Sequence, residues 1–157
     1  PPLNIISEYY LRKSCNQKIG NHFSYLNNNK IYIKKLKKLN SFPNFDIEKL
    51  SGKIDIFLNF ISFQEMEHTI VSNYIDKIFK LNPKFILLRN LREGKNTSKN
   101  KNKYKHKFYY FVKKPIKKND YIRMFKKKYV LVDCNVDPYG YKTWDNYNSE
   151  LMLFKKK

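Results

Sequence analysis

The pattern of apolar and polar positions predicts an alternating α/β order in the middle of the chain. Two short apolar runs, residues 54–60 and 85–88, are bounded by polar residues in the way that is typical of buried strands. Between them, apolar side chains recur at helical spacing over residues 65–81, which predicts an amphipathic helix that ends before Pro83. A strand, a helix and a second strand in this order indicate two neighbouring parallel strands.

The flanking segments predict smaller elements around this unit. We expect an amphipathic helix over residues 3–13, a short outer strand over 30–33 and a short helix over 120–125. The runs at 129–132 and 151–154 predict two closing strands that pair antiparallel at the sheet edge. Residues 93–107 have almost no apolar content, so we expect a mobile loop that is a candidate lid.

Polar side chains follow both central strands at the point where each strand ends. Asn59, Ser62, Gln64 and Glu65 lie in or directly after the first run, and residues 89–92 follow the second. In a parallel sheet the carboxyl ends of the strands open into a crevice where α/β folds bind ligands. We therefore expect these two polar groups to converge on one rim of the sheet.

Structural interpretations of the same residues stay open. Ser62 followed by Glu65 three residues later fits a capping box, in which both side chains satisfy backbone donors at the start of a helix. Arg89 at a strand end fits an ion pair with a carboxylate of the same fold. Its alternative is a bidentate grip on an anionic substrate, for which arginine is better suited than lysine.

Length and composition set the broad class. The chain of 157 residues fits one domain, residues 1–157, and its 41% of hydrophobic residues exclude a compositionally disordered protein. No apolar run approaches the roughly 20 residues of a membrane span, so we expect a soluble, cytoplasmic protein. Two cysteines without a C-x-x-C pattern and three scattered histidines predict no metal site.

The net charge of +20 raises a second possibility, a basic module that binds nucleic acid. Only four of the 33 basic residues are arginine, and Lys, Asn, Ile, Tyr and Phe, which share A/T-rich codons, are all abundant. Biased codon usage accounts for such a surface without selection for binding. Nucleic acid is thus the less favoured partner, and a non-enzymatic basic α/β module is the alternative function.

Four blocks of the sequence resemble putative sugar O-methyltransferases, a class I group that depends on S-adenosylmethionine. Residues 1–11, PPLNIISEYYL, are similar to the segment just beyond the second strand of that family. Residues 55–66 and 87–95 resemble its fourth- and fifth-strand regions, and residues 149–154, SELMLF, resemble its last strand. The resemblance implies a Rossmann-like methyltransferase sheet with a C-terminal antiparallel strand pair.

The resemblance also implies roles for the polar residues of the rim. Glu65 would take the proton from a sugar hydroxyl during methyl transfer, and Asn59 and Ser62 would contact the cofactor. Gln64, Arg89 and Asn90 would bind the sugar or nucleotide-sugar substrate. Correct positioning of the hydroxyl, methyl and sulfur in line would matter as much as the proton transfer.

The sequence departs from this family in its cofactor half. The four glycines are isolated, so no glycine-rich turn occurs, and no first strand precedes the blocks that match. The chain also begins with Pro1-Pro2 and no signal region follows. We therefore expect the C-terminal portion of a longer enzyme or a degenerate copy, with an incomplete sheet whose apolar edge is left to pair elsewhere.

Overall fold

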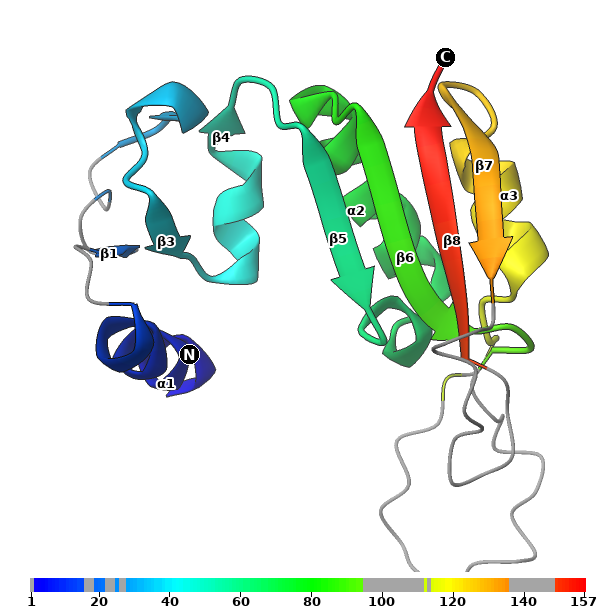
Figure 1. Cartoon of the computed structure of the whole chain (residues 1–157), viewed down its shortest axis with the longest axis horizontal. Coiled ribbons are helices and arrows are strands. Elements are labelled where there is room, and N and C mark those ends of the chain that lie inside the picture. Colours follow the sequence, from blue (N-terminus) through cyan, green and yellow to red (C-terminus); the bar gives the residue numbers. More distant parts are fainter. Residues whose placement is uncertain are drawn as a thin grey trace, which may run out of the picture. The chain divides into compact units, whose positions relative to one another are not determined.

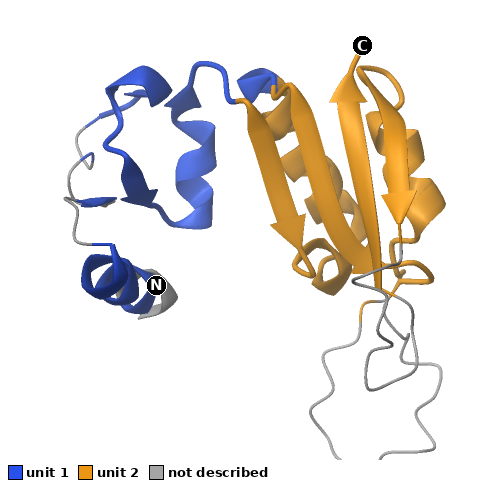
Figure 2. Cartoon of the chain, in the orientation of Figure 1, with its two compact units in different colours: residues 1–54, 80–82 blue, residues 55–79, 83–157 orange. Residues whose placement is uncertain are grey.

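The computed structural model describes residues 2–15, 19–21, 25, 28–94, 112, 114–135 and 149–157. These residues form two compact units (Figure 2). The first comprises residues 1–54 and 80–82, and the second comprises residues 55–79 and 83–157. A single methyltransferase domain over residues 1–157 stays a prediction.

The described residues of the first unit include one α-helix, two small parallel strand pairs and two 3₁₀ helices. Helix α1 (Pro2–Ser14) confirms the predicted N-terminal helix. Strand β1 (Ile19–Asn21) pairs with β3 (Leu39–Ser41), and β2 (Ile31–Tyr32) pairs with β4 (Leu50–Ser51). The 3₁₀ helices η2 (Ile33–Lys35) and η3 (Asn44–Glu48) follow β2 and β3. The strand predicted for residues 30–33 is therefore shorter than expected.

The second unit is built on a mixed four-stranded sheet. Its strands are β5 (Ile56–Phe60), β6 (Phe85–Leu91), β7 (Tyr129–Asn135) and β8 (Ser149–Lys156), and their spatial order is β5-β6-β8-β7 (Figure 1). Strands β5 and β6 are parallel, whereas β8 is antiparallel to both of its neighbours. The predicted parallel pair and the predicted antiparallel closing pair are both confirmed, and the chain has a mixed α/β fold.

Two helices pack on one face of this sheet. Helix α2 (His68–Leu81) contributes Val71, Ile75 and Ile78 to the core, and α3 (Lys118–Phe125) contributes Tyr121 and Phe125. The sheet supplies the opposite side of the core from β6 and β8, through Ile86, Leu88, Met152 and Phe154. Both helices were predicted, although α2 begins at His68 rather than at residue 65 because the 3₁₀ helix η4 (Phe63–Glu65) precedes it. None of the helices in the described part of the chain is long and apolar enough to cross a membrane.

The burial predicted for the first central strand is wrong. Ile56, Leu58 and Phe60 of β5 are 45%, 53% and 50% exposed. The reason is that β5 is the last described strand on its side of the sheet and the helices cover one face only. Only Phe57 of this strand packs against the core. Residues 95–107 of the predicted loop lie outside the described residues.

Candidate functional site

A tight turn ends β5 at the carboxyl edge of the sheet. Ile61 has a φ of 70°, a conformation that a β-branched residue adopts only where the surrounding structure holds it. Its backbone N–H donates to the carbonyl of Arg89 at 2.7 Å. Asn59 Oδ1 accepts from the N–H of Phe63 at 3.2 Å, so the Asn59 side chain bridges the turn. These bonds direct the chain from β5 into η4.

Gln64 joins the segment after β5 to the end of β6. Its backbone N–H donates to Asn90 Oδ1 at 3.2 Å, and its side-chain Oε1 accepts from the N–H of Leu91 at 2.8 Å. Gln64 is 6% exposed and Asn90 is fully buried. The sequence prediction that the two polar groups converge is confirmed for this pair. Their roles in binding a substrate stay predictions.

Asn90 carries a further buried donor. Its Nδ2 atom is buried and makes no hydrogen bond to any residue that the structure describes. A buried donor without an acceptor costs about 1–3 kcal/mol. An acceptor on a bound molecule would recover this energy. Asn90 is therefore a buried polar group of the candidate site with unused hydrogen-bonding capacity.

Ser62 and Glu65 lie exposed at the rim. The Ser62 hydroxyl donates to the carbonyl of Phe60 at 3.3 Å and makes no capping bond to η4. The capping-box interpretation of Ser62 is therefore wrong, and Asn59 supplies the side-chain acceptor for the first turn instead. Glu65 Oε1 accepts from Gln64 Nε2 at 3.3 Å, which orients the carboxylate from the buried side.

Arg89 and Asn90 point to opposite faces of the sheet, because neighbouring side chains of a strand alternate. Asn90 lies on the face that α2 and α3 cover, together with buried Leu88. Arg89 lies on the open face beside Phe60, its partner in the parallel pairing. There its Nε donates to Ser149 Oγ at 3.1 Å. The structure thus places the predicted substrate ligands on one edge but divides them between two faces.

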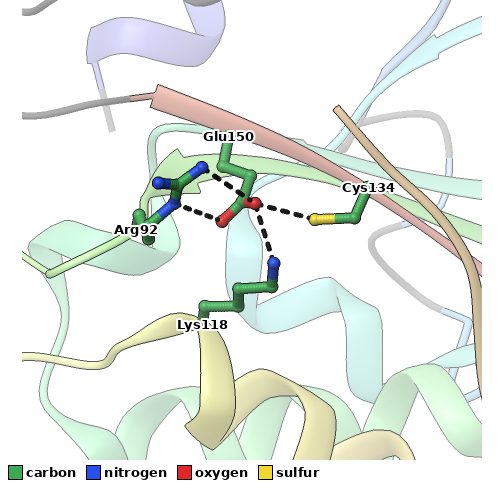
Figure 3. Close-up of polar contacts among 4 residues, drawn as sticks. All are labelled: Arg92, Lys118, Cys134 and Glu150. Atoms are coloured by element: carbon green, nitrogen blue, oxygen red, sulfur yellow. Dashed lines mark hydrogen bonds and ion pairs between the residues drawn. The ribbon is translucent and has the colours of Figure 1, made fainter. Parts of the chain in front are cut away.

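A buried ion cluster near the same edge was not predicted from the sequence. Glu150, 2% exposed, accepts hydrogen bonds from Arg92 Nε at 3.2 Å and Lys118 Nζ at 2.8 Å (Figure 3). Cys134 Sγ lies 2.8 Å from Glu150 Oε1 as a third donor. Arg92 follows β6, Lys118 begins α3, Cys134 lies in β7 and Glu150 lies in β8. The Glu150 carboxylate therefore links four segments of the second unit through hydrogen bonds.

The charges of this cluster are stable at neutral pH. Burial alone raises the pKa of Glu150, but the donors Cys134, Lys118 and Arg92 outweigh burial and hold that pKa below its ordinary value. The hydrogen bond to Glu150 raises the pKa of Lys118. Burial, together with the hydrogen bond to Glu150, raises the pKa of the Cys134 thiol, which therefore keeps its proton and donates it. This cluster is a structural clamp, since its groups satisfy one another.

Comparisons with known proteins add no relative to this geometry. No protein-family model matches the sequence, and the searches of curated proteins and of solved structures give no match. Among the described residues, no group of three or more His, Cys, Asp or Glu side chains could hold a metal ion. The functional argument therefore rests on the residues of the chain and on their contacts.

Proposed function

We propose that the carboxyl edge of β5 and β6 is the substrate side of a site for S-adenosylmethionine-dependent methyl transfer to a sugar hydroxyl. The observation that carries the proposal is the bond between Gln64 and Asn90, which joins the polar segments following two adjacent parallel strands. Ligands of open α/β sheets bind at this position. The 157 residues contain no glycine-rich turn. We therefore expect tight cofactor binding only in a protein that combines this site with such a turn.

The order of the strands supports the proposal. The resemblance assigns the fourth and fifth strands to the β5 and β6 regions and the last strand to β8. In the structure β5 and β6 are parallel neighbours, and β8 runs antiparallel beside β6 with β7 on its far side. The resemblance implies a C-terminal antiparallel strand pair, which is the arrangement that β7 and β8 have.

The charge of the rim suits a cationic cofactor. Residues 59–67, which comprise the end of β5 and the segment that follows it at the rim, contain no lysine or arginine and carry Glu65 and Glu67, although 33 of the 157 residues are basic. S-adenosylmethionine carries a positive sulfonium, which a lysine-rich surface would repel. In a protein of net charge +20, this segment is the one best suited to accept it. Asn59 and Ser62, which lie within it, are proposed to contact the cofactor.

The chemistry proposed for the chain's own residues is proton removal and orientation. The cofactor, when bound, supplies an activated methyl group. Asn59 and Ser62 would contact that cofactor, and Glu65 would take the proton that the sugar hydroxyl gives up. Gln64 holds the Glu65 carboxylate through the 3.3 Å bond from its Nε2. Asn90, which is fully buried, orients Gln64 through the bond that it accepts from the Gln64 backbone N–H. Arg89, on the open face of the same edge, pairs with an anionic group of the substrate.

The test compares two conservative variants in a chain that includes the cofactor half. Glu65→Gln keeps the shape of the side chain but removes the base, so we expect kcat to fall about 100-fold or more. Arg89→Lys keeps the positive charge but cannot form two parallel hydrogen bonds to an anion as the planar guanidinium does. We therefore expect KM for an anionic sugar to rise while kcat changes little. Transfer of labelled methyl to the sugar measures both.

The control for fold is the thermal midpoint of each variant, which should stay within a few degrees of the parent because Glu65 is exposed. An unchanged kcat in Glu65→Gln would remove Glu65 from the reaction and leave a mechanism of positioning alone.

A further inference from the structure

The outer edge of β5 presents unused backbone groups. Among the described residues, β6 is the only strand that pairs with β5. The carbonyl of Asp55 accepts from the N–H of Phe85, and the N–H of Ile61 donates to the carbonyl of Arg89. Because successive residues of a parallel strand bond to alternate sides, the odd-numbered residues of β5 bond to β6. The N–H and C=O groups of Ile56, Leu58 and Phe60 therefore point away from the sheet.

The two edges of the sheet differ in their protection against further pairing. At the other edge, β7 has a register irregularity between Leu131 and Asp133, and it carries the charge of Asp133. Bulges and charges are the usual devices that block edge pairing. Strand β5, with the sequence IFLNF, has neither charge, proline nor bulge. Of the two edge strands that the structure describes in this sheet, β5 is the one that lacks both devices.

The sequence of β5 is complementary to itself in antiparallel pairing. A two-fold axis at Leu58 would place Leu58 opposite its own copy and Ile56 opposite Phe60 of the second copy. This register uses the outward groups of all three residues. The side chains of Ile56, Leu58 and Phe60 share one face of the strand, so the apolar stripes of the two copies would continue across the junction.

The distribution of charge permits two such copies to meet. Two chains of net charge +20 repel each other, and lysines at the junction would prevent association. Residues 54–76, which include the whole of β5, contain no lysine or arginine. A backbone edge, a self-complementary register and a lysine-free segment therefore coincide in one strand.

We propose that the 157-residue chain forms a two-fold dimer through antiparallel pairing of β5 with β5 of a second copy, which joins two four-stranded sheets into one of eight strands. The proposal goes beyond the methyltransferase function.

Sedimentation equilibrium on the 157-residue protein tests the dimer. We expect a concentration-dependent mass that approaches twice the 19.1 kDa of one chain. Leu58→Lys places a charge at the axis and should shift the protein to monomer at the same concentrations. Val132→Lys is the matched control, because Val132 is 49% exposed on the other edge strand and Leu58 is 53% exposed. The control should associate like the parent.

A parent that stays monomeric, or a Leu58→Lys variant that still associates, overturns the proposal. Both lysine variants are first checked by circular dichroism. Leu58→Gln, which adds no charge, serves as the second variant should Leu58→Lys not fold, and it should weaken the dimer in the same direction.

Cross-linking tests the register. In a Cys15→Ser, Cys134→Ser background, Leu58→Cys should form an intermolecular disulfide on mild oxidation, since paired residues across antiparallel strands lie within disulfide range. The same background with Val132→Cys should stay uncross-linked. Cross-linking through position 132 and not through position 58 would place the contact on β7 and contradict the proposal.

Discussion

Ile61 shows how much of the site depends on a single backbone conformation. Its φ of 70° turns the chain at the end of β5, and the bond to Arg89 holds the turn. The sequence gives no sign of this, because glycine or asparagine is the residue expected at such a position. By contrast, Asn59, Gln64 and Glu65 were identified from their place after a strand. Position along the chain predicts which residues reach the rim, and it does not predict a strained turn.

Ile61→Gly should stabilise the protein. The positive φ costs isoleucine of the order of 1–3 kcal/mol, and glycine adopts it without strain but loses more chain entropy on folding. Because the Ile61 side chain is 46% exposed, little burial is lost. We expect the free energy of unfolding in urea to rise by about 1 kcal/mol.

The control for that prediction is Ile56→Gly. Ile56 is similarly exposed, at 45%, but lies within β5. We expect Ile56→Gly to lower the free energy of unfolding by about 1 kcal/mol, because glycine weakens the interior of a strand. Equal effects of the two substitutions would show that Ile61 is not strained.

At the scale of elements, the sequence predicted where the strands and helices lie and missed what fastens them. Helical spacing located α2, apolar runs located the four strands of the second unit, and a short helix was predicted where α3 lies. The Glu150 clamp had a signal that was not used. Side chains of a strand alternate between its two faces, so Glu150 shares a face of β8 with the buried residues Met152 and Phe154. This alternation predicts that the Glu150 carboxylate is buried. Its partners could not be predicted, because they come from three distant segments.

Glu150→Gln should destabilise the second unit and flatten its response to acid. The lowered pKa of Glu150 means that the clamp contributes stability above the ordinary glutamate value of 4.5, and that this contribution is lost as the pH falls below it. At pH 7 the substitution leaves Arg92 and Lys118 without their carboxylate. Because their side chains are 36% and 30% exposed, water offsets part of this, and we expect a loss of about 2 kcal/mol. Urea denaturation between pH 3 and 7 measures both effects.

The matched control for the clamp is Glu8→Gln. Glu8 pairs with Arg12, whose side chain is 56% exposed, on the surface of α1. An exposed pair of this kind contributes less than about 1 kcal/mol. If Glu150→Gln costs no more than Glu8→Gln and the acid response stays unchanged, the buried clamp does not stabilise the fold.

At the scale of the whole molecule, the sequence predicted the α/β class and the mixed sheet, while the exposure of β5 was not foreseen. An apolar run predicts a strand, but burial depends on what lies beside that strand. Here the helices cover one face, and among the described residues no strand lies beyond β5. The net charge likewise does not describe how the charges are distributed. A net charge of +20 does not reveal that residues 54–76 contain no lysine.

The lysine surface should bind nucleic acid only weakly. If it reflects codon usage, affinity for mixed-sequence RNA or DNA should fall steeply with salt and vanish near physiological ionic strength, where exposed charges are screened over about 8 Å. Fluorescence anisotropy over a salt series measures this. Sequence-selective binding that persists at 150 mM salt would favour the basic-module alternative over the methyltransferase.

The central claim places a methyltransferase site at the carboxyl edge of β5 and β6. Its most direct test is an NMR titration of the ¹⁵N-labelled 157-residue protein with S-adenosylhomocysteine, the product of the methyl donor. Without a glycine-rich turn the binding should be millimolar rather than micromolar. We predict saturable shifts at the amides of residues 59–66, which include the proposed cofactor contacts Asn59 and Ser62. Shifts that cluster elsewhere, or none at these amides, would contradict the assignment of the site.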